Sequence, residues 1–196
     1  MDAVERHFGH LLSRPEISWL NMGGGHWITK PDYDRKLLAA LIRRIRERYG
    51  VEVWLEPGEA TAIHTGVLRC RVLDLFSAEG VNHAILDVSA SAHMPDTLEM
   101  PYRPEAIGAG QPGEKAWTCR LAGKSCLAGD IFGEYQFDRP LTIGDRLSFI
   151  DTAGYTMVKK NWFNGLKMPS IVVKQLDGTV EVVREFGYDD YLSSLS

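Results

Sequence analysis

The stretch that decides the fold begins with Ile17-Ser-Trp-Leu-Asn-Met-Gly-Gly-Gly25 and closes with Val51-Glu-Val-Trp-Leu-Glu-Pro-Gly58. Each of these parts opens with a short apolar run that is typical of a buried strand and ends at glycine, a frequent stop signal. Between them, residues 33–49 repeat apolar side chains every three or four positions, which predicts an amphipathic helix with its arginines in water. Gly50 stands where many helices end in a left-handed residue. The stretch therefore predicts a strand, a helix and a second parallel strand, which is the repeat of α/β folds.

The pattern changes on either side of this unit. Residues 3–12 have helical spacing, and Pro15 follows them. After Gly58, short β-rich runs alternate with turn signals, which favours an antiparallel sheet or barrel. These runs are residues 62–76, 82–90, 115–121, 131–137, 146–152, 170–175 and 179–185. We therefore predict an α+β chain with two domains, residues 1–60 and residues 61–196.

Composition excludes several classes of function. The chain has 196 residues, 44% of them hydrophobic, and a net charge of −4, so it can bury a core and has no basic surface for nucleic acid or anionic membranes. Its longest apolar run, Leu37 to Ile42, is far too short to cross a bilayer, and Met1 opens no secretory signal. Three unpatterned cysteines suit a reducing compartment. We expect a cytoplasmic protein without membrane or nucleic-acid partners.

Three local features are candidates for chemistry, and each has a structural alternative. The triple glycine at residues 23–25 lets backbone amides approach a phosphate, although a tight turn is the commoner reason for such glycines. Glu56 ends a parallel strand at the sheet edge where α/β folds place their sites, or it is a solvated carboxylate. Cys126 lies among glycines where a thiol is reachable, or it is a small buried apolar residue.

A metal site is not predicted. His93, Asp96 and Glu99 fall in one loop, but their spacing matches no closed zinc pattern. A serine nucleophile is not predicted either, because the chain contains no Gly-x-Ser-x-Gly turn.

Five segments, taken in order, carry a resemblance to a known family. They resemble the carboxynorspermidine (carboxyspermidine) decarboxylases, a branch of the alanine-racemase-like, fold-type III pyridoxal-phosphate enzymes that also include the ornithine and diaminopimelate decarboxylases. The resemblance covers about residues 5–175. The segments are Trp19-Leu-Asn-Met-Gly-Gly-Gly-His26, Leu55-Glu-Pro-Gly-Glu-Ala60, His93-Met-Pro-Asp-Thr-Leu-Glu-Met-Pro-Tyr-Arg-Pro104, Cys126-Leu-Ala-Gly-Asp130 and Tyr155-Thr-Met-Val-Lys-Lys-Asn-Trp-Phe-Asn-Gly165.

The resemblance implies both a fold and an activity. Residues 1–60 would be the last β/α units of a (β/α)8 barrel, and residues 61–196 would be the C-terminal β domain of a head-to-tail homodimer with sites at its interface. The activity would be the decarboxylation of carboxynorspermidine or carboxyspermidine to norspermidine or spermidine, a step of polyamine biosynthesis. The cofactor would be pyridoxal 5'-phosphate.

The resemblance also implies roles in cofactor binding. Gly23, Gly24 and Gly25 would hold the cofactor phosphate, and Tyr155 would add a hydroxyl group to it. Glu56 would face the pyridine nitrogen and keep it protonated. His26, directly after the glycines, would belong to the same cofactor site.

The roles implied near the reacting carbon fall on later residues. Cys126 would return a proton to Cα after CO2 leaves, since thiols can donate protons near neutral pH, and Asp130 would shape the same loop. Asp87 would pair with the distal amine of the substrate. Arg103 would bind a substrate carboxylate with its bidentate guanidinium group.

In this family a lysine in the first barrel strand anchors the cofactor, and no segment of this sequence resembles that strand. We therefore expect the chain to act as a C-terminal portion, in a homodimer or with a complementary N-terminal half chain. The alternative is a non-catalytic dimerisation or regulatory module derived from such a decarboxylase. Apolar strand edges at residues 17–22 and 51–56 predict association in either case.

Overall fold

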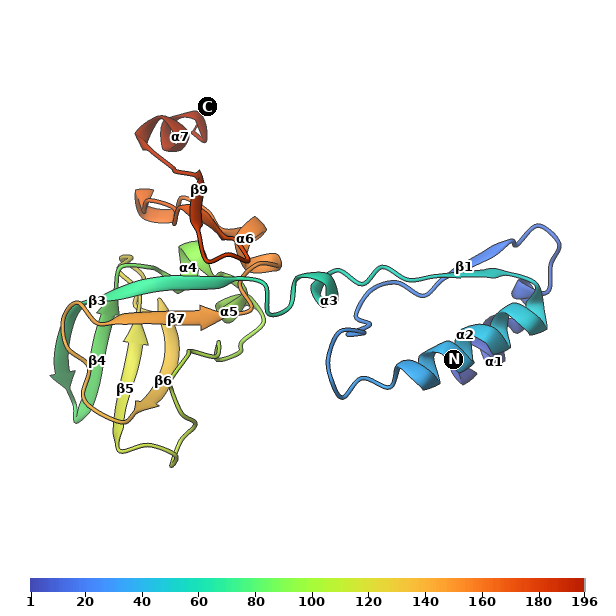
Figure 1. The fold of residues 1–196 in the computed structure, drawn as a ribbon, viewed down its shortest axis with the longest axis horizontal. Helices are drawn as coiled ribbons and strands as arrows, with labels where there is room; N and C mark the ends of the chain where they lie inside the picture. Colours follow the sequence, from blue (N-terminus) through green and yellow to red (C-terminus); the bar gives the residue numbers. More distant parts are fainter. Residues whose placement is uncertain (196) are drawn as a thin grey trace. The chain divides into compact units, whose positions relative to one another are not determined.

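The computed structural model describes residues 1–195. The chain forms two compact units, Met1–Ile63 and the part from His64 onward (Figure 1). The first unit contains a two-stranded sheet. The second contains a five-stranded sheet and a separate two-stranded sheet. Within these 195 residues, no helix combines the length and the apolar character needed to span a membrane.

The first unit contains the predicted strand–helix–strand repeat. Its two strands pair in parallel, with Trp19 opposite Glu52 and Asn21 opposite Trp54. The elements are α1 (Asp2–Leu12), β1 (Trp19–Asn21), α2 (Arg35–Tyr49), β2 (Glu52–Trp54) and α3 (Glu59–Ala62). Residues 59–62 are thus helical, and the strand expected from residue 62 begins only at Val67. That this unit is the end of a (β/α)8 barrel stays a prediction.

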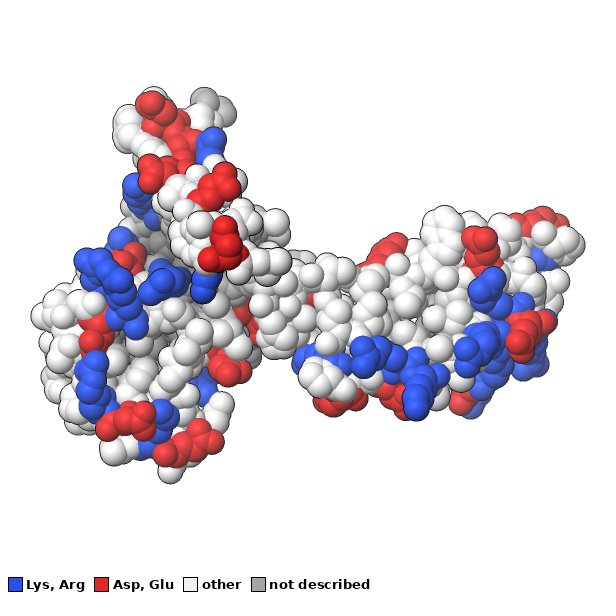
Figure 2. Space-filling view, viewed as in Figure 1, with Lys and Arg blue, Asp and Glu red and all other residues white. Residues whose placement is uncertain are grey.

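The limits of α2 follow from its two end residues. At the start, Asp34 accepts a hydrogen bond from the Leu37 amide at 2.8 Å, which satisfies one of the unpaired donors of the first turn. At the end, Gly50 adopts φ 70°, as predicted. Ile45 is fully buried beneath the helix. The basic side chains lie along the outer surface of α2 (Figure 2), where Arg44 pairs with Glu5 of α1 at 2.5 Å.

The second unit is a mixed sheet whose strands lie in the order β6-β5-β4-β3-β7 (Figure 1). These strands are β3 (Val67–Ala78), β4 (Val81–Leu86), β5 (Trp117–Ala122), β6 (Ile131–Phe137) and β7 (Arg146–Ile150). The remaining elements are α4 (Ala90–His93), α5 (Asp96–Glu99), α6 (Tyr155–Lys159), the 3₁₀ turn η1 (Phe163–Gly165), β8 (Ile171–Lys174), β9 (Val180–Arg184) and α7 (Tyr188–Ser193).

The prediction of an antiparallel sheet is wrong for one pair of strands. β4 and β5 run parallel, with Ala84 opposite Leu121, while the other neighbouring pairs in this sheet are antiparallel. Parallel neighbours need a long crossover, and residues 87–116 supply one that contains α4 and α5. The sequence signals marked each strand but not the direction in which this crossover returns the chain.

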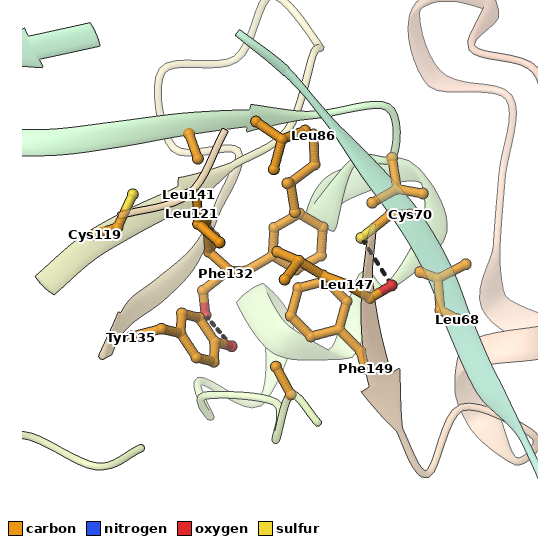
Figure 3. Packing of buried hydrophobic residues seen from close by; sticks show 14 of the residues in the cluster. Leu68, Cys70, Leu86, Cys119, Leu121, Phe132, Tyr135, Leu141, Leu147 and Phe149 are labelled. Atoms are coloured by element: carbon orange, nitrogen blue, oxygen red, sulfur yellow. Dashed lines mark hydrogen bonds between the residues drawn. The ribbon is translucent and has the colours of Figure 1, made fainter. Parts of the chain in front are cut away.

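The core of the second unit lies against one face of its sheet (Figure 3). Along β3, Leu68, Cys70 and Val72 are buried while their neighbours are exposed, the alternation expected of a strand with one face in the core. In the same core, the rings of Phe132 in β6 and Phe149 in β7 stack with centroids 4.6 Å apart. The same core includes Val88, Ala90 and Met94, so it also holds the segment that follows β4.

Candidate functional site

The triple glycine follows β1 directly, at the carboxyl end of the parallel pair. Gly23 and Gly25 adopt φ of 71° and 76°, a region that residues with a side chain rarely occupy. A Cβ added to Gly24 would lie 3.0 Å from the carbonyl oxygen of Glu56. All three positions therefore favour glycine, for backbone conformation at two of them and for close approach at the third.

Asn21 joins this glycine loop to Glu56. Its Oδ1 accepts a hydrogen bond from the Gly23 amide at 2.8 Å, and its Nδ2 donates to Glu56 Oε1 at 2.5 Å. The Glu56 amide in turn donates to the Gly23 carbonyl at 2.9 Å. The structure thus brings the predicted phosphate loop and the predicted ring-nitrogen carboxylate together. Sequence reasoning missed Asn21, although an asparagine two residues before a glycine is a typical turn-forming signal.

His26 follows the glycines and is half-buried. Its Nδ1 lies 3.1 Å from the hydroxyl oxygen of Tyr33, just before α2. This contact orients the imidazole ring within the first unit. A role for His26 in cofactor binding stays a prediction.

In the second unit, Asp130 is the centre of the loop that carries Cys126. The residue is 2% exposed, and its Oδ1 accepts hydrogen bonds from the amides of Ala90 at 2.6 Å and Ser91 at 3.2 Å. Oδ2 accepts from the amide of Ser125 at 3.1 Å. A Cβ on Gly123 would fall 2.2 Å from Oδ2, so the backbone there must be glycine. Asp130 therefore fastens the Cys126 loop to the first residues of α4.

Cys126 is the exposed cysteine among the three in the chain. Burial raises the pKa of Cys70, in β3, and of Cys119, in β5, to about 12, so these two thiols stay protonated in the core. The amide of Cys126 donates to Oδ1 of Asn164 at 2.8 Å. Of the two alternatives open from the sequence, the structure supports a reachable thiol.

His93 and the carboxylates near it have structural contacts. His93 is buried, and its Nδ1 accepts a hydrogen bond from the Ser89 amide at 3.1 Å. Burial lowers the pKa of His93 to about 4, and the charge of Lys124 adds to this effect. Asp96 and Glu99 both pair with Lys159 of α6. Among residues 1–195, no three His, Cys, Asp or Glu side chains are grouped so that they could hold a metal ion.

The two predicted substrate residues contact the protein itself. Asp87, after β4, accepts a hydrogen bond from the Arg71 amide at 2.8 Å through Oδ1. The guanidinium of Arg103 lies 4.6 Å from the centre of the Tyr135 ring, and its Nη1 donates to the Glu134 carbonyl at 3.2 Å. If Arg103 binds a substrate carboxylate, it would therefore use its Nη2 and Nε groups, because Nη1 already donates to the Glu134 carbonyl.

Tyr155 is the first residue of α6, and it is 61% exposed. The candidate residues thus fall into two groups. Gly23, Gly24, Gly25, His26 and Glu56 belong to the first unit, and Asp87, Arg103, Cys126, Asp130 and Tyr155 belong to the second. The first group offers backbone amides, an imidazole and a carboxylate, while the second offers a thiol, a phenol, a guanidinium and two carboxylates.

Most of this chain is similar to known decarboxylases. Residues 24–153 match the pyridoxal-dependent decarboxylase C-terminal sheet domain. Over 193 residues, 98% of this chain, the sequence is 49% identical to carboxynorspermidine/carboxyspermidine decarboxylase of Herminiimonas arsenicoxydans, of which it covers 51%. It is 48% identical, also over 98% of this chain, to carboxyaminopropylagmatine decarboxylase of a Synechocystis species, of which it covers 49%.

A solved structure extends this similarity to the fold. The crystal structure of carboxynorspermidine decarboxylase from Campylobacter jejuni, complexed with norspermidine, matches with a TM-score of 0.89 at 40% identity. The match covers 98% of this chain and 55% of that one. The chain thus spans about half the length of the curated relatives that it matches.

Proposed function

Since the chain belongs to the pyridoxal-dependent decarboxylases and contains their C-terminal sheet domain, we propose that it is the C-terminal portion of a polyamine-forming carboxy-lyase. The reaction would release CO2 from carboxynorspermidine or carboxyspermidine and leave norspermidine or spermidine. The observation that carries this proposal is the 49% identity over 193 residues to an enzyme of that name. The resemblance found in the five sequence segments is thereby confirmed, whereas the activity of the whole protein is our inference.

The residues of the first unit suit pyridoxal 5'-phosphate. The positive φ angles of Gly23 and Gly25 and the close approach at Gly24 form a loop without side chains, where backbone amides can bind phosphate oxygens. Glu56, tied to this loop through Asn21, would accept a hydrogen bond from a protonated ring nitrogen. When bound, the cofactor supplies a sink for the electron pair that decarboxylation leaves on the substrate. His26 would complete the part of the binding site that the first unit supplies. We assign to Tyr155, in the second unit, a hydroxyl group for the cofactor phosphate.

In the second unit, Cys126 would deliver the proton that Cα needs after CO2 has left. Its exposure and its fixed amide support this role, because a proton donor must be both reachable and held within hydrogen-bond range. Asp130 would act through the loop that it fastens to α4. Asp87 would pair with the distal amine of the substrate, and Arg103 would bind a carboxylate of the substrate.

Carboxyaminopropylagmatine is a second candidate substrate, because a relative named for it is almost as similar to this chain. The Synechocystis relative, named carboxyaminopropylagmatine decarboxylase, is 48% identical to this chain, which is nearly the value for the Herminiimonas relative. Carboxyaminopropylagmatine should therefore be compared directly with the two other substrates.

We further propose that the protein is cytoplasmic and works as a homodimer or with a complementary N-terminal half chain. The three free cysteines of the chain support a reducing compartment. Half-exposed Trp19 and Trp54 on β1 and β2, whose rings stack 5.1 Å apart, support further packing of protein against this small sheet.

The test is a decarboxylation assay on the chain alone and on the chain mixed with the separately expressed N-terminal half of the Herminiimonas relative, called here the reconstituted enzyme. We expect norspermidine or spermidine from the reconstituted enzyme with added pyridoxal phosphate. A folded, cofactor-loaded complex that converts none of the three substrates would refute the proposal. It would favour the alternative of a regulatory module, which predicts that the chain lowers the activity of an intact decarboxylase.

Borohydride reduction and mass mapping of any lysine that has reacted with the cofactor would complete this test. A labelled lysine on the N-terminal half is the expected result. A single saturable lysine on this chain would mean that the chain carries its own cofactor anchor.

A further inference from the structure

We propose that Asn164 is a positioning residue that holds the Cys126 loop for proton transfer, as one member of a closed ring of hydrogen bonds through α4. The inference rests on the proposed function, because it takes Cys126 as the proton donor. It adds a residue of another loop, 38 positions further along the chain, to the machinery of that step.

The contact between the two loops is direct. Oδ1 of Asn164 accepts the Cys126 amide at 2.8 Å. Asn164 adopts φ 58° and ψ 17°, the left-handed region that asparagine tolerates better than most residues with a side chain. The turn around it is closed by a hydrogen bond from the Gly165 amide to the Trp162 carbonyl at 2.8 Å. The side chain is therefore presented from a rigid turn.

The same turn is anchored to α4 by Asn161. Its amide donates to the Ala92 carbonyl at 2.8 Å, and its Nδ2 donates to the Ser91 carbonyl at 3.0 Å. Its Oδ1 accepts the Phe163 amide at 2.9 Å, which ties the anchor to η1. Asn161 thus donates hydrogen bonds to backbone carbonyls of α4, while Asp130 accepts hydrogen bonds from backbone amides of the same helix.

Together these contacts close a ring. From α4, Asp130 reaches the amide of Ser125, the neighbour of Cys126, and Asn164 holds the amide of Cys126 itself. From Asn164 the chain returns to α4 through Asn161. Two adjacent amides of the Cys126 loop are thereby held by different side chains, Asp130 and Asn164, while the cysteine side chain stays exposed. Removing the Asn164 acceptor would release the Cys126 amide but leave the Asp130 contacts in place.

A purely structural role for Asn164 is to supply a left-handed turn residue, and a matched set of variants separates the two roles. Asn164→Gly keeps the left-handed backbone without strain but removes the acceptor. Asn164→Asp keeps an acceptor oxygen at the same position. Glu79→Gly is the control, because Glu79 has φ 51° in the turn between β3 and β4, away from this ring in sequence.

The first readout is amide hydrogen exchange at Cys126 in the purified chain without cofactor. We expect Asn164→Gly to raise the exchange rate at Cys126 about fivefold, as the loss of one net hydrogen bond implies, and Asn164→Asp to restore most of the protection. The second readout is turnover by the reconstituted enzyme. We expect kcat to fall about tenfold in Asn164→Gly with KM within about twofold of wild type, because misplacing a reacting group slows chemistry more than binding.

Unchanged exchange at Cys126 in Asn164→Gly would overturn the proposal, and so would equal changes in the Glu79→Gly control. Normal turnover in Asn164→Gly, together with slow turnover in Cys126→Ala, would also overturn it while leaving the proposed function intact. If Cys126→Ala itself turns over normally, the role assigned to Cys126 fails, and the positioning role of Asn164 fails with it.

Discussion

Replacing Asp130 with asparagine tests whether this buried carboxylate holds the second unit together. Its two oxygens accept three backbone amides, from Ala90, Ser91 and Ser125. Asparagine has nearly the same shape, but one oxygen becomes a donor. If the remaining oxygen keeps the two amides of α4, the new NH2 group faces the Ser125 amide, donor against donor.

The expected loss of stability follows from that geometry. One hydrogen bond to a charged group is worth about 1.5–3 kcal/mol, and leaving the half-buried Ser125 amide unpaired adds about 1 kcal/mol. We estimate a total loss of about 3 kcal/mol, a large part of the roughly 5–15 kcal/mol that stabilises a typical domain. With a urea dependence of about 2 kcal/mol per molar, the unfolding midpoint should fall by about 1.5 M.

The buried cysteines provide an assay for the second unit alone. Cys70 and Cys119 are 4% and 0% exposed, so their labelling by a thiol reagent across a urea series, mapped by mass spectrometry, reports the unfolding of the sheet. The exposed Cys126 should label at all urea concentrations and serves as an internal standard.

The matched control for this experiment is Asp74→Asn. The carboxylate of Asp74 is exposed and accepts one amide, that of its neighbour Leu75, at 2.9 Å. We expect that control to stay close to wild type, as most surface substitutions do. If Asp130→Asn shifts the midpoint no more than Asp74→Asn does, the argument that Asp130 fastens the Cys126 loop to α4 is refuted.

Three further predictions concern pH, cofactor binding and turnover. Burial lowers the pKa of His93 to about 4, so between about pH 6.5 and 4 the unfolded chain binds more protons than the folded chain. The free energy of unfolding should therefore fall by up to about 3 kcal/mol as the pH is lowered from 6.5 to 4. His93→Asn should remove this dependence on pH in urea titrations. Gly24→Ala should weaken pyridoxal phosphate binding in a spectroscopic titration of the reconstituted enzyme, because its Cβ would press on the Glu56 carbonyl, whereas Gly187→Ala, with open space around it, should not. Cys126→Ala should slow turnover by about a hundredfold or divert protonation to another atom, and an unchanged rate and product would exclude Cys126 from the mechanism.

Local signals in the sequence were sufficient to predict most of the helices and strands. The apolar spacing of residues 33–49, Asp34 before the helix and Gly50 after it depend on neighbours within a few positions, so α2 was predictable almost to its ends. The β-rich runs marked the strands for the same reason. The resemblance in five ordered segments identified the family, which the comparisons confirm.

The arrangement around Cys126 was not predictable in the same way. Asp130 binds amides 39 and 40 positions earlier, and Asn164 binds one 38 positions earlier, distances over which spacing patterns carry no information. Arg103 shows the same limit, because its contact with the ring of Tyr135 exists only once β6 has packed into the sheet.

By itself, the sequence determined which segments become helices and strands, where glycine is needed and which family the chain belongs to, because these depend on local backbone preferences and on ordered motifs. Only the tertiary structure decided that β4 and β5 run parallel, that Asn21 joins Glu56 to the glycine loop, and that α4 holds one loop through its amides and another through its carbonyls. The physical reason is that a hydrogen bond between distant residues forms only after packing of the core has brought their backbones within about 3 Å.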